Sequence, residues 1–219
     1  LETGSLAPDY CYRCTGKLWP RAEDAGRDEL IHEDVPWPAP GQWYKCSLTK
    51  GHGAMTLSDA IGLSCNHFFI SLHDRIDPEG LRRFCRASGL FGTDVAAGLD
   101  PEAAAGGLAE PENDRDRYLL PVGFGSKVTL ANVAAFFTTL FSGGTARELT
   151  TGNRPATITG KVPLGAVTRD RLRAGFAIAT QSGTARQFWF PGRPDALCKT
   201  GSGLVDGEVF QMHGWFVCA

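Results

Sequence analysis

Apolar positions recur at helical spacing in several segments, and each segment is bounded by residues that typically begin or end a helix. Thr56-Leu57-Ser58-Asp59 has the pattern of a capping box, in which a hydroxyl and a carboxylate satisfy free backbone amides. Asp77 with Pro78 marks another helix start, and Gly89 its end. The pattern predicts five helices, which would run over residues 57–63, from His67 to Ile76, over 78–88, from Thr129 to 142 and from Thr168 to 182.

The apolar residues of the longer helices define the faces that we expect to be buried. In the third helix these are Leu81, Phe84 and Cys85. In the fifth they are Leu172 and Phe176. The fourth helix has the longest apolar stripe, and its members are Leu130, Val133, Ala134, Phe137 and Phe141.

The C-terminal end of the chain has a different pattern. The segments Leu197 to Gly203 and Val209 to Cys218 flank Asp206-Gly207, which predicts a β-hairpin. The prolines and tryptophans of residues 17–50 predict a long ordered loop, and residues 92–125 are expected to be mostly loop. Because helices come first and a hairpin last, the order predicts an α+β fold with an antiparallel β-sheet flanked by helices.

Composition narrows the class of protein. The chain has 219 residues, of which 42% are hydrophobic and 21% charged, and a net charge of -2. This is the balance of an ordinary globular domain, and it offers no basic surface for nucleic acid. No apolar run is long enough to span a bilayer, and no signal peptide is visible. The chain opens on Leu1 rather than Met, so we expect an upstream segment to have been removed.

Two short motifs carry candidate chemistry. Ser64-Cys65-Asn66 lies where one predicted helix ends and another begins, and Lys199-Thr200-Gly201 begins the predicted hairpin, followed by Ser202. Alone, neither motif is specific: S-x-N is frequent by chance and is often only a helix cap, whereas K-T-G is rarer but can be only the end of a surface strand. Together, in this order and on these elements, they match the layout of one family.

The chain resembles the transpeptidase domain of penicillin-binding proteins, which are relatives of serine β-lactamases. Further segments carry the resemblance in the family's order: Cys14-Thr15-Gly16, Gly51-His52-Gly53, Gly123-Phe124-Gly125, Val128-Thr129-Leu130, Ser142-Gly143-Gly144, Ser182-Gly183-Thr184-Ala185 and His213-Gly214-Trp215-Phe216-Val217. The likeness therefore extends over the whole chain. It implies a β-lactamase/transpeptidase-like fold and a D,D-transpeptidase that cross-links peptidoglycan by serine acyl transfer on D-Ala-D-Ala peptides.

The resemblance also implies a role for each motif residue. Ser64 would relay a proton to the leaving amine, and Asn66 would hold the substrate amide. Lys199 would supply positive charge to the site. From the paired motifs we expect Ser64 and Lys199 to face one cleft, with their side chains within hydrogen-bond or one-water reach. Thr200 and Ser202 would donate hydrogen bonds to the substrate carboxylate, and the Ser202 amide would form half of the oxyanion hole. Gly201 would let backbone and substrate approach closely.

One element of the family pattern is missing. The family's nucleophile belongs to an S-x-x-K motif at a helix start upstream of S-x-N. Ser47-Leu48-Thr49-Lys50 matches the letters, but the glycines that follow disfavour the helix that would bring serine and lysine to one face. We therefore expect residues 1–219 to be a partial domain that lacks the upstream S-x-x-K segment and a C-terminal strand and helix, and to be inactive alone.

The resemblance leaves rival functions open: a β-lactam sensor, a non-catalytic penicillin-binding module or, less favoured, a β-lactamase. It implies peptidoglycan stem peptides and β-lactams as partners, with no nucleic acid and no cofactor. It also implies a membrane-anchored parent, with no membrane contact by these residues, and an extracytoplasmic location.

The cysteines allow several interpretations. They number seven, so at least one thiol is free or pairs outside the chain, and such a number indicates an oxidising compartment. A Cys14–Cys46 disulfide would pin the long loop and leave Cys11 spare, and we favour it. Alternatively, Cys11, Cys14, Cys46 and His52 offer four soft ligands for zinc. Free thiols are the third possibility. The favoured reading has no metal, and it makes Cys65 a small buried group.

Overall fold

The structure is a computed structural model, which describes residues 6–7, 9–18, 29–30, 42–92, 106–150, 155–188, 193, 195–204 and 212–219. These residues form six α-helices and small, mostly antiparallel sheets, so the α+β prediction is confirmed. The predicted Asp206-Gly207 turn and most of the proline-rich segment lie outside the described residues.

The helices begin where the capping residues predict. Thr56 and Thr129 each cap their helix in a complete capping box, and Asp77 accepts hydrogen bonds from the backbone N–H groups of Glu79 and Gly80. The helices are α1 (Leu57–Leu63), α2 (Asn66–Ile70), α3 (Pro78–Ala87), α4 (Asp114–Leu119), α5 (Leu130–Phe141) and α6 (Ala166–Gln181). Short 3-10 helices cover His73–Arg75, Leu120–Val122 and Arg186–Phe188.

The strands pair in small sheets. The longest pair is the predicted hairpin, β10 (Cys198–Leu204) with β11 (Met212–Cys218), which are antiparallel. The other antiparallel pairs are β1 (Tyr12–Cys14) with β5 (Gly53–Met55), β2 (Lys17–Leu18) with β4 (Gln42–Lys45), β6 (Gly107–Leu108) with β7 (Ser126–Lys127), and β8 (Thr145–Arg147) with β9 (Ile158–Lys161). Only β3 (Glu29–Leu30) pairs in parallel among the described strands, on β4.

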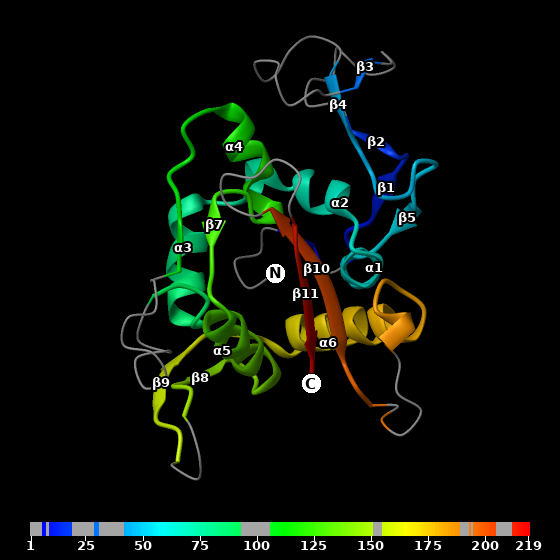
Figure 1. The fold of residues 1–219 in the computed structure, drawn as a ribbon. Coiled ribbons are helices and arrows are strands. Elements are labelled where there is room, and N and C mark those ends of the chain that lie inside the picture. The colour runs from blue at the N-terminus through cyan, green and yellow to red at the C-terminus, as the bar shows by residue number, and fades with distance from the viewer. Residues whose placement is uncertain are drawn as a thin grey trace.

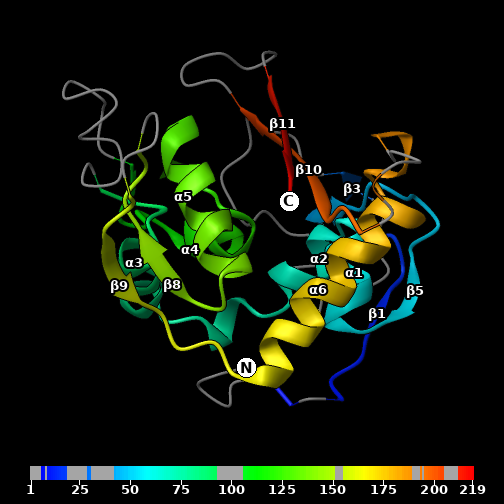
Figure 2. The same cartoon turned by 90° about the horizontal axis from the view of Figure 1, so that it is seen from below.

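Helix α6 lies across α1 and beside β10 (Figures 1 and 2). It thus packs against both elements next to the motifs, α1 before Ser64 and β10 with Lys199. The two helices approach closely because glycines face the contact: a Cβ built on Gly62 would lie 2.3 Å from Cγ2 of Ile178. On the strand side, Thr180 of α6 accepts a hydrogen bond from the backbone N–H of Cys198 at 2.8 Å. Both motifs are therefore held against one helix.

A separate core lies under the N-terminal strands. Phe68 of α2 is fully buried there, and the rings of Tyr10 and Tyr12 meet it edge to face. The other buried members of this core are Leu6, Cys14, Cys46, Met55, Ala60 and Cys65. Three of its buried side chains are thus cysteines.

The helix predicted from His67 to Ile76 is wrong in its length. Helix α2 ends at Ile70, and a 3-10 helix follows at His73–Arg75. The ring of His73 hydrogen-bonds through Nδ1 to the carbonyl oxygen of Ile70 at 3.1 Å, and a continued α-helix would need that oxygen for residue 74. The His73 side chain thus competes with the next helical N–H for the carbonyl oxygen of Ile70.

The loop predicted over residues 92–125 is also corrected, because α4 lies within it. Asn113 caps this helix by accepting a hydrogen bond from the N–H of Asp116 at 3.0 Å. The buried face of α5 differs from the prediction as well: Leu130 is 75% exposed, whereas Asn132 and Thr139 are buried. Asn132 can be buried because it donates to the carbonyl oxygens of Gly89 and Gly92.

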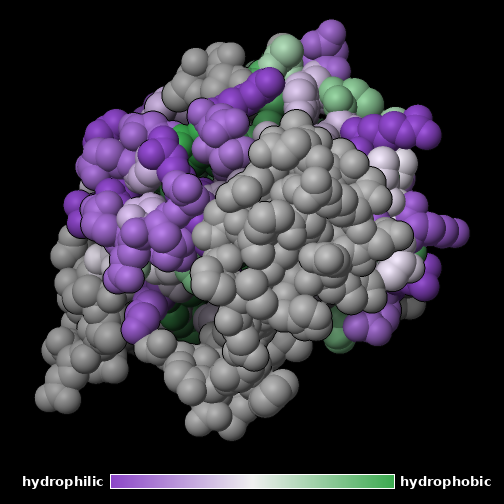
Figure 3. Space-filling view, turned by 90° about the horizontal axis from the view of Figure 1, so that it is seen from above, coloured by the Kyte–Doolittle hydropathy of each residue, from purple (hydrophilic) through white to green (hydrophobic). Residues whose placement is uncertain are grey.

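No helix within the described ranges is long and apolar enough to cross a membrane. In the face seen from above, hydrophilic side chains cover most of the described surface, and apolar areas are small (Figure 3).

Candidate active site

Ser64 ends helix α1 in an unusual backbone conformation. Its φ is 53° and its ψ is 47°, which is the left-handed region, and it is the only non-glycine residue with a positive φ among the described residues. Its N–H donates to the carbonyl oxygens of Ala60 and Ile61, which closes the last turn. The chain then passes through buried Cys65 into α2. The turn leaves the Ser64 side chain half-buried at the end of the helix.

Lys199 approaches Ser64 from strand β10. Its Nζ donates a hydrogen bond to Ser64 Oγ at 2.9 Å and another to the carbonyl oxygen of Thr200. The expectation that the two side chains lie within hydrogen-bond reach is confirmed. Residues 135 positions apart in sequence thus form the centre of the candidate site.

The environment of Lys199 makes its amine easier to deprotonate. Burial lowers the pKa of Lys199 below its ordinary value of 10.5, because the charged form loses solvation. A lysine with a lowered pKa in contact with a serine hydroxyl makes this pair a candidate for acid–base chemistry.

Thr200 extends the hydrogen-bonded chain to a residue to which the sequence had given no role. Its hydroxyl donates to Thr184 Oγ1 at 2.8 Å, and the N–H of Thr184 donates to the carbonyl oxygen of Gly62 at 3.3 Å. Gly183 has no room for a side chain, because a Cβ there would lie 2.2 Å from that same carbonyl oxygen. The resemblance of Ser182-Gly183-Thr184-Ala185 to a family turn was the signal that could have identified Thr184.

The remaining motif residues are exposed. Asn66 is exposed at the first position of α2. Gly201 and Ser202 are exposed on β10, where they pair with Trp215 and Gly214 of β11. The structure thus joins Ser64, Lys199 and Thr200 by contact, and it places the other three next to them in the chain. A cavity of about 300 Å³ adjoins this group, lined by Leu63, Ser182, Gly183, Thr184, Arg186 and Gln187.

Ser47-Leu48-Thr49-Lys50 does not form a helix. The segment is a bend followed by a turn between β4 and β5, as the glycines after it predict. Ser47 Oγ lies 3.9 Å from the sulfur of Cys46. The serine and lysine of this string therefore lack the shared helical face that an S-x-x-K nucleophile needs.

The cysteine predictions require a correction. Cys14 and Cys46 are free thiols, so the predicted disulfide between them is wrong. Within the described residues, a disulfide joins Cys198 and Cys218, which are directly opposite each other on β10 and β11. This pairing, which hairpin register brings about, was not predicted from the sequence.

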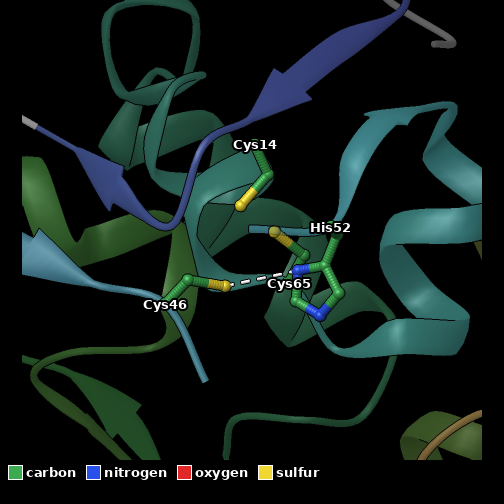
Figure 4. A group of neighbouring side chains, drawn as sticks. All are labelled: Cys14, Cys46, His52 and Cys65. Carbon is green, nitrogen blue, oxygen red and sulfur yellow. Dashed lines mark hydrogen bonds between the residues drawn. The ribbon is translucent and has the colours of Figure 1, made fainter. Parts of the chain in front are cut away.

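Four Cys and His side chains converge behind the Ser64 turn (Figure 4). They are Cys14, Cys46, His52 and Cys65, whereas Cys11 is exposed and lies outside the group. Cys65 is buried, as predicted, but it also lies beside two other cysteines and a histidine. Burial raises the pKa of Cys65 to about 12 and also raises the pKa of Cys46, because thiolates lose solvation in the core.

The comparisons with known proteins agree with the motifs. A family model described as "Penicillin binding protein transpeptidase domain" matches residues 25–218, and the chain therefore belongs to this family. No curated protein sequence matches the chain.

Solved structures of penicillin-binding proteins have the same fold. PBPA from Mycobacterium tuberculosis superposes with a TM-score of 0.71 at 16% identity, over 99% of this chain and 48% of that one. PBP2 from Pseudomonas aeruginosa, in complex with WCK 5153, has a TM-score of 0.70 at 18% identity, over 100% and 47%. The transpeptidase domain of Burkholderia pseudomallei penicillin-binding protein 3 has a TM-score of 0.67 at 20% identity, over 82% and 56%. The chain thus spans about half the length of these structures.

Proposed function

We propose that the protein is a penicillin-binding D,D-transpeptidase that cross-links peptidoglycan by serine acyl transfer on peptides ending in D-Ala-D-Ala. The observation that carries the proposal is the hydrogen bond of 2.9 Å between Lys199 Nζ and Ser64 Oγ, in a chain of the transpeptidase family. Acyl transfer needs a proton path to the leaving amine, and this contact provides the two groups of such a path.

Each site residue has a role in the proposal. Ser64 passes a proton to the leaving amine, with Lys199 as the neighbouring donor and acceptor. Asn66 is exposed at the start of α2, where it can bind the substrate amide. Thr200 and Ser202 donate hydrogen bonds to the substrate carboxylate, which Lys199 also attracts. The Ser202 amide N–H donates a hydrogen bond to the substrate carbonyl oxygen and forms half of the oxyanion hole, and Gly201, exposed beside it, lets the substrate approach the backbone closely.

A second part of the proposal concerns the nucleophile. Residues 1–219 form part of a transpeptidase domain, and the attacking serine belongs to an S-x-x-K helix upstream of them, with a further strand and helix downstream. The turn conformation of Ser47 to Lys50 supports this reading, because that string presents no helical serine–lysine pair. The 219 residues alone would then form no covalent adduct with penicillin.

The location and partners follow from the same proposal. The substrates are peptidoglycan stem peptides, and β-lactams bind at the same site because they resemble D-Ala-D-Ala. A transpeptidase with these substrates acts outside the cytoplasm, held there by a membrane anchor of the parent protein.

The test is acylation of the complete gene product by labelled penicillin, read by intact-protein mass spectrometry. We expect one adduct on the complete protein and none on the folded 219-residue chain. Ser64→Ala should slow acylation by roughly 100-fold or more, the usual contribution of a positioned acid–base group. Ser71→Ala is the matched control. Ser71 ends α2, and its hydroxyl donates to the carbonyl oxygen of Phe68 in that helix rather than to a group of the candidate site.

The rival functions give different results in the same experiment. A sensor would form the adduct but release no D-alanine from a D-Ala-D-Ala peptide. A β-lactamase would turn over a chromogenic β-lactam many times per molecule. An adduct mapped to Ser47 or Ser64 in the 219-residue chain would contradict the proposed division of labour.

A further inference from the structure

The four side chains behind the Ser64 turn come from four separate segments. Cys14 ends β1, Cys46 follows β4, His52 precedes β5, and Cys65 lies between α1 and α2. Their nearest ligand atoms, three sulfurs and one ring nitrogen, all lie within 4.8 Å of one another. Figure 4 shows these atoms pointing toward a common centre, with Cys46 Sγ 3.3 Å from His52 Nδ1.

The number and type of these atoms are those of a closed zinc site. Zinc in structural sites takes four ligands, and three cysteines with one histidine are a common set. With Zn–S bonds of ~2.3 Å, neighbouring sulfurs of a tetrahedral site lie about 3.8 Å apart. Atoms that already lie within 4.8 Å need to move by about 1 Å or less to reach that geometry.

Two ligand-bearing turns are fitted together backbone against backbone. Gly16 has a φ of 90°, and a Cβ built on it would lie 2.1 Å from the carbonyl oxygen of Thr49. Gly51 has a φ of 77°, and a Cβ there would lie 2.3 Å from the carbonyl oxygen of Cys14. The N–H of Cys46 donates to the carbonyl oxygen of Gly16 at 3.0 Å. This packing holds the Cys14 and Cys46 turns together independently of their side chains.

Burial argues that the thiols have a common function. Cys14 is 2% exposed, Cys46 is 1% exposed and Cys65 is fully buried. A disulfide would use only two of the three sulfurs and would leave the third as an unpaired thiol in the core, next to half-buried His52. A metal ion uses all four.

We propose that Cys14, Cys46, Cys65 and His52 bind one zinc ion in a closed structural site. Three thiols lose their protons on binding and His52 binds as the neutral ring, so one Zn²⁺ replaces three protons. Because all four positions are protein ligands, the ion ties β1, the turns on either side of Lys50 and the α1–α2 junction together. The site does not depend on the proposed transpeptidase activity.

The test is the metal content of the complete protein, purified without chelators and measured by inductively coupled plasma mass spectrometry. We expect one zinc per chain. After exchange for cobalt, the visible spectrum should be that of tetrahedral cobalt with thiolate ligands. His52→Ala, at a half-buried loop position, should lose stoichiometric metal, while Cys85→Ser on α3 is the matched control and should keep it.

Several outcomes would overturn the proposal. One is a metal-free protein whose peptide map shows a disulfide between any two of Cys14, Cys46 and Cys65. Another is loss of metal in Cys11→Ser but not in Cys65→Ser, which would mean a different ligand set. Circular dichroism of each variant separates loss of the ion from loss of the fold, and a folded His52→Ala that retains one tightly bound zinc would also refute the assignment.

Discussion

The contact between Lys199 and Ser64 shows how a single buried charge shapes the site. The amine is removed from much of its solvent and receives a hydroxyl and a carbonyl oxygen in exchange. Neither of these two partners carries a full negative charge, and the loss of solvation lowers the pKa of Lys199. The cost to stability and the readiness to transfer a proton therefore have the same origin.

The lowered pKa of Lys199 predicts how the free energy of unfolding depends on pH. Because the folded-state pKa of Lys199 lies below its ordinary value of 10.5, the unfolded chain binds more protons between these two values. The free energy of unfolding contributed by Lys199 is thus lowest at neutral pH and rises as pH approaches 10.5. Lys199→Met should be relatively stabilised at pH 7, and this advantage should shrink toward alkaline pH.

Urea unfolding at a series of pH values measures the difference. Lys161→Met is the control, because Lys161 is exposed on β9 and its replacement removes the same charge. A stability difference between wild type and Lys199→Met that stays constant from neutral to alkaline pH would contradict the burial argument.

Among the elements, the crossing of α1 and α6 determines where Ser64 lies. The contact depends on glycines on both helices: Gly62 faces Ile178, and Gly175 faces Ile61. In an exposed helix, replacing glycine by alanine would stabilise by about 1 kcal/mol. Here a Cβ on Gly62 would meet the branched Cβ of Ile178 at 2.6 Å, and that atom cannot move without its helix.

We therefore expect Gly62→Ala to destabilise the protein by roughly 1–3 kcal/mol, since overpacking outweighs helix propensity. Thermal or urea unfolding measures this. Gly107→Ala should change little, because its Cβ would have no atom within 4 Å. Equal or greater stability of Gly62→Ala would show that the helices can separate at little cost.

The elements also show which parts of the fold the sequence determines locally. Helix starts were predicted correctly at Thr56, Asp77 and Thr129, because a cap is made by residues within one turn of each other. The buried face of α5 was not, because Asn132 is buried by carbonyl groups of Gly89 and Gly92, some forty positions earlier. From its sequence position alone, polar Asn132 is predicted to be exposed, because the distant carbonyl groups that accept its hydrogen bonds are visible only in the fold.

For the molecule as a whole, the candidate site is assembled from segments that are distant in sequence. The two motifs were sufficient to predict that Ser64 and Lys199 meet, because the family resemblance supplies the arrangement that spacing alone does not. The role of Thr184 and the convergence of Cys65 with Cys14 could not be predicted in this way. Both depend on how turns from different sheets approach the end of α1.

The Cys198–Cys218 disulfide links the strand of Lys199 to its partner near the end of the chain. The two residues are 20 positions apart. Closing a loop of that length in the unfolded chain is worth about 3 kcal/mol on the chain-entropy estimate. Cys198→Ala with Cys218→Ala should lower the free energy of unfolding by roughly that amount, measured by urea unfolding without reductant. A matched loss in the buried free thiol variant Cys85→Ala would show that cavity formation, not the cross-link, is responsible.

The left-handed backbone of Ser64 has a consequence for how the protein can evolve. A non-glycine residue in this conformation costs roughly 1–2 kcal/mol, and glycine is the residue that helices most often place at such an end. Selection for heat resistance alone would therefore favour glycine at position 64, and a glycine there would have no hydroxyl for Lys199 to meet. The serine found at this position therefore costs stability that a glycine would recover, and it keeps the hydroxyl that Lys199 contacts.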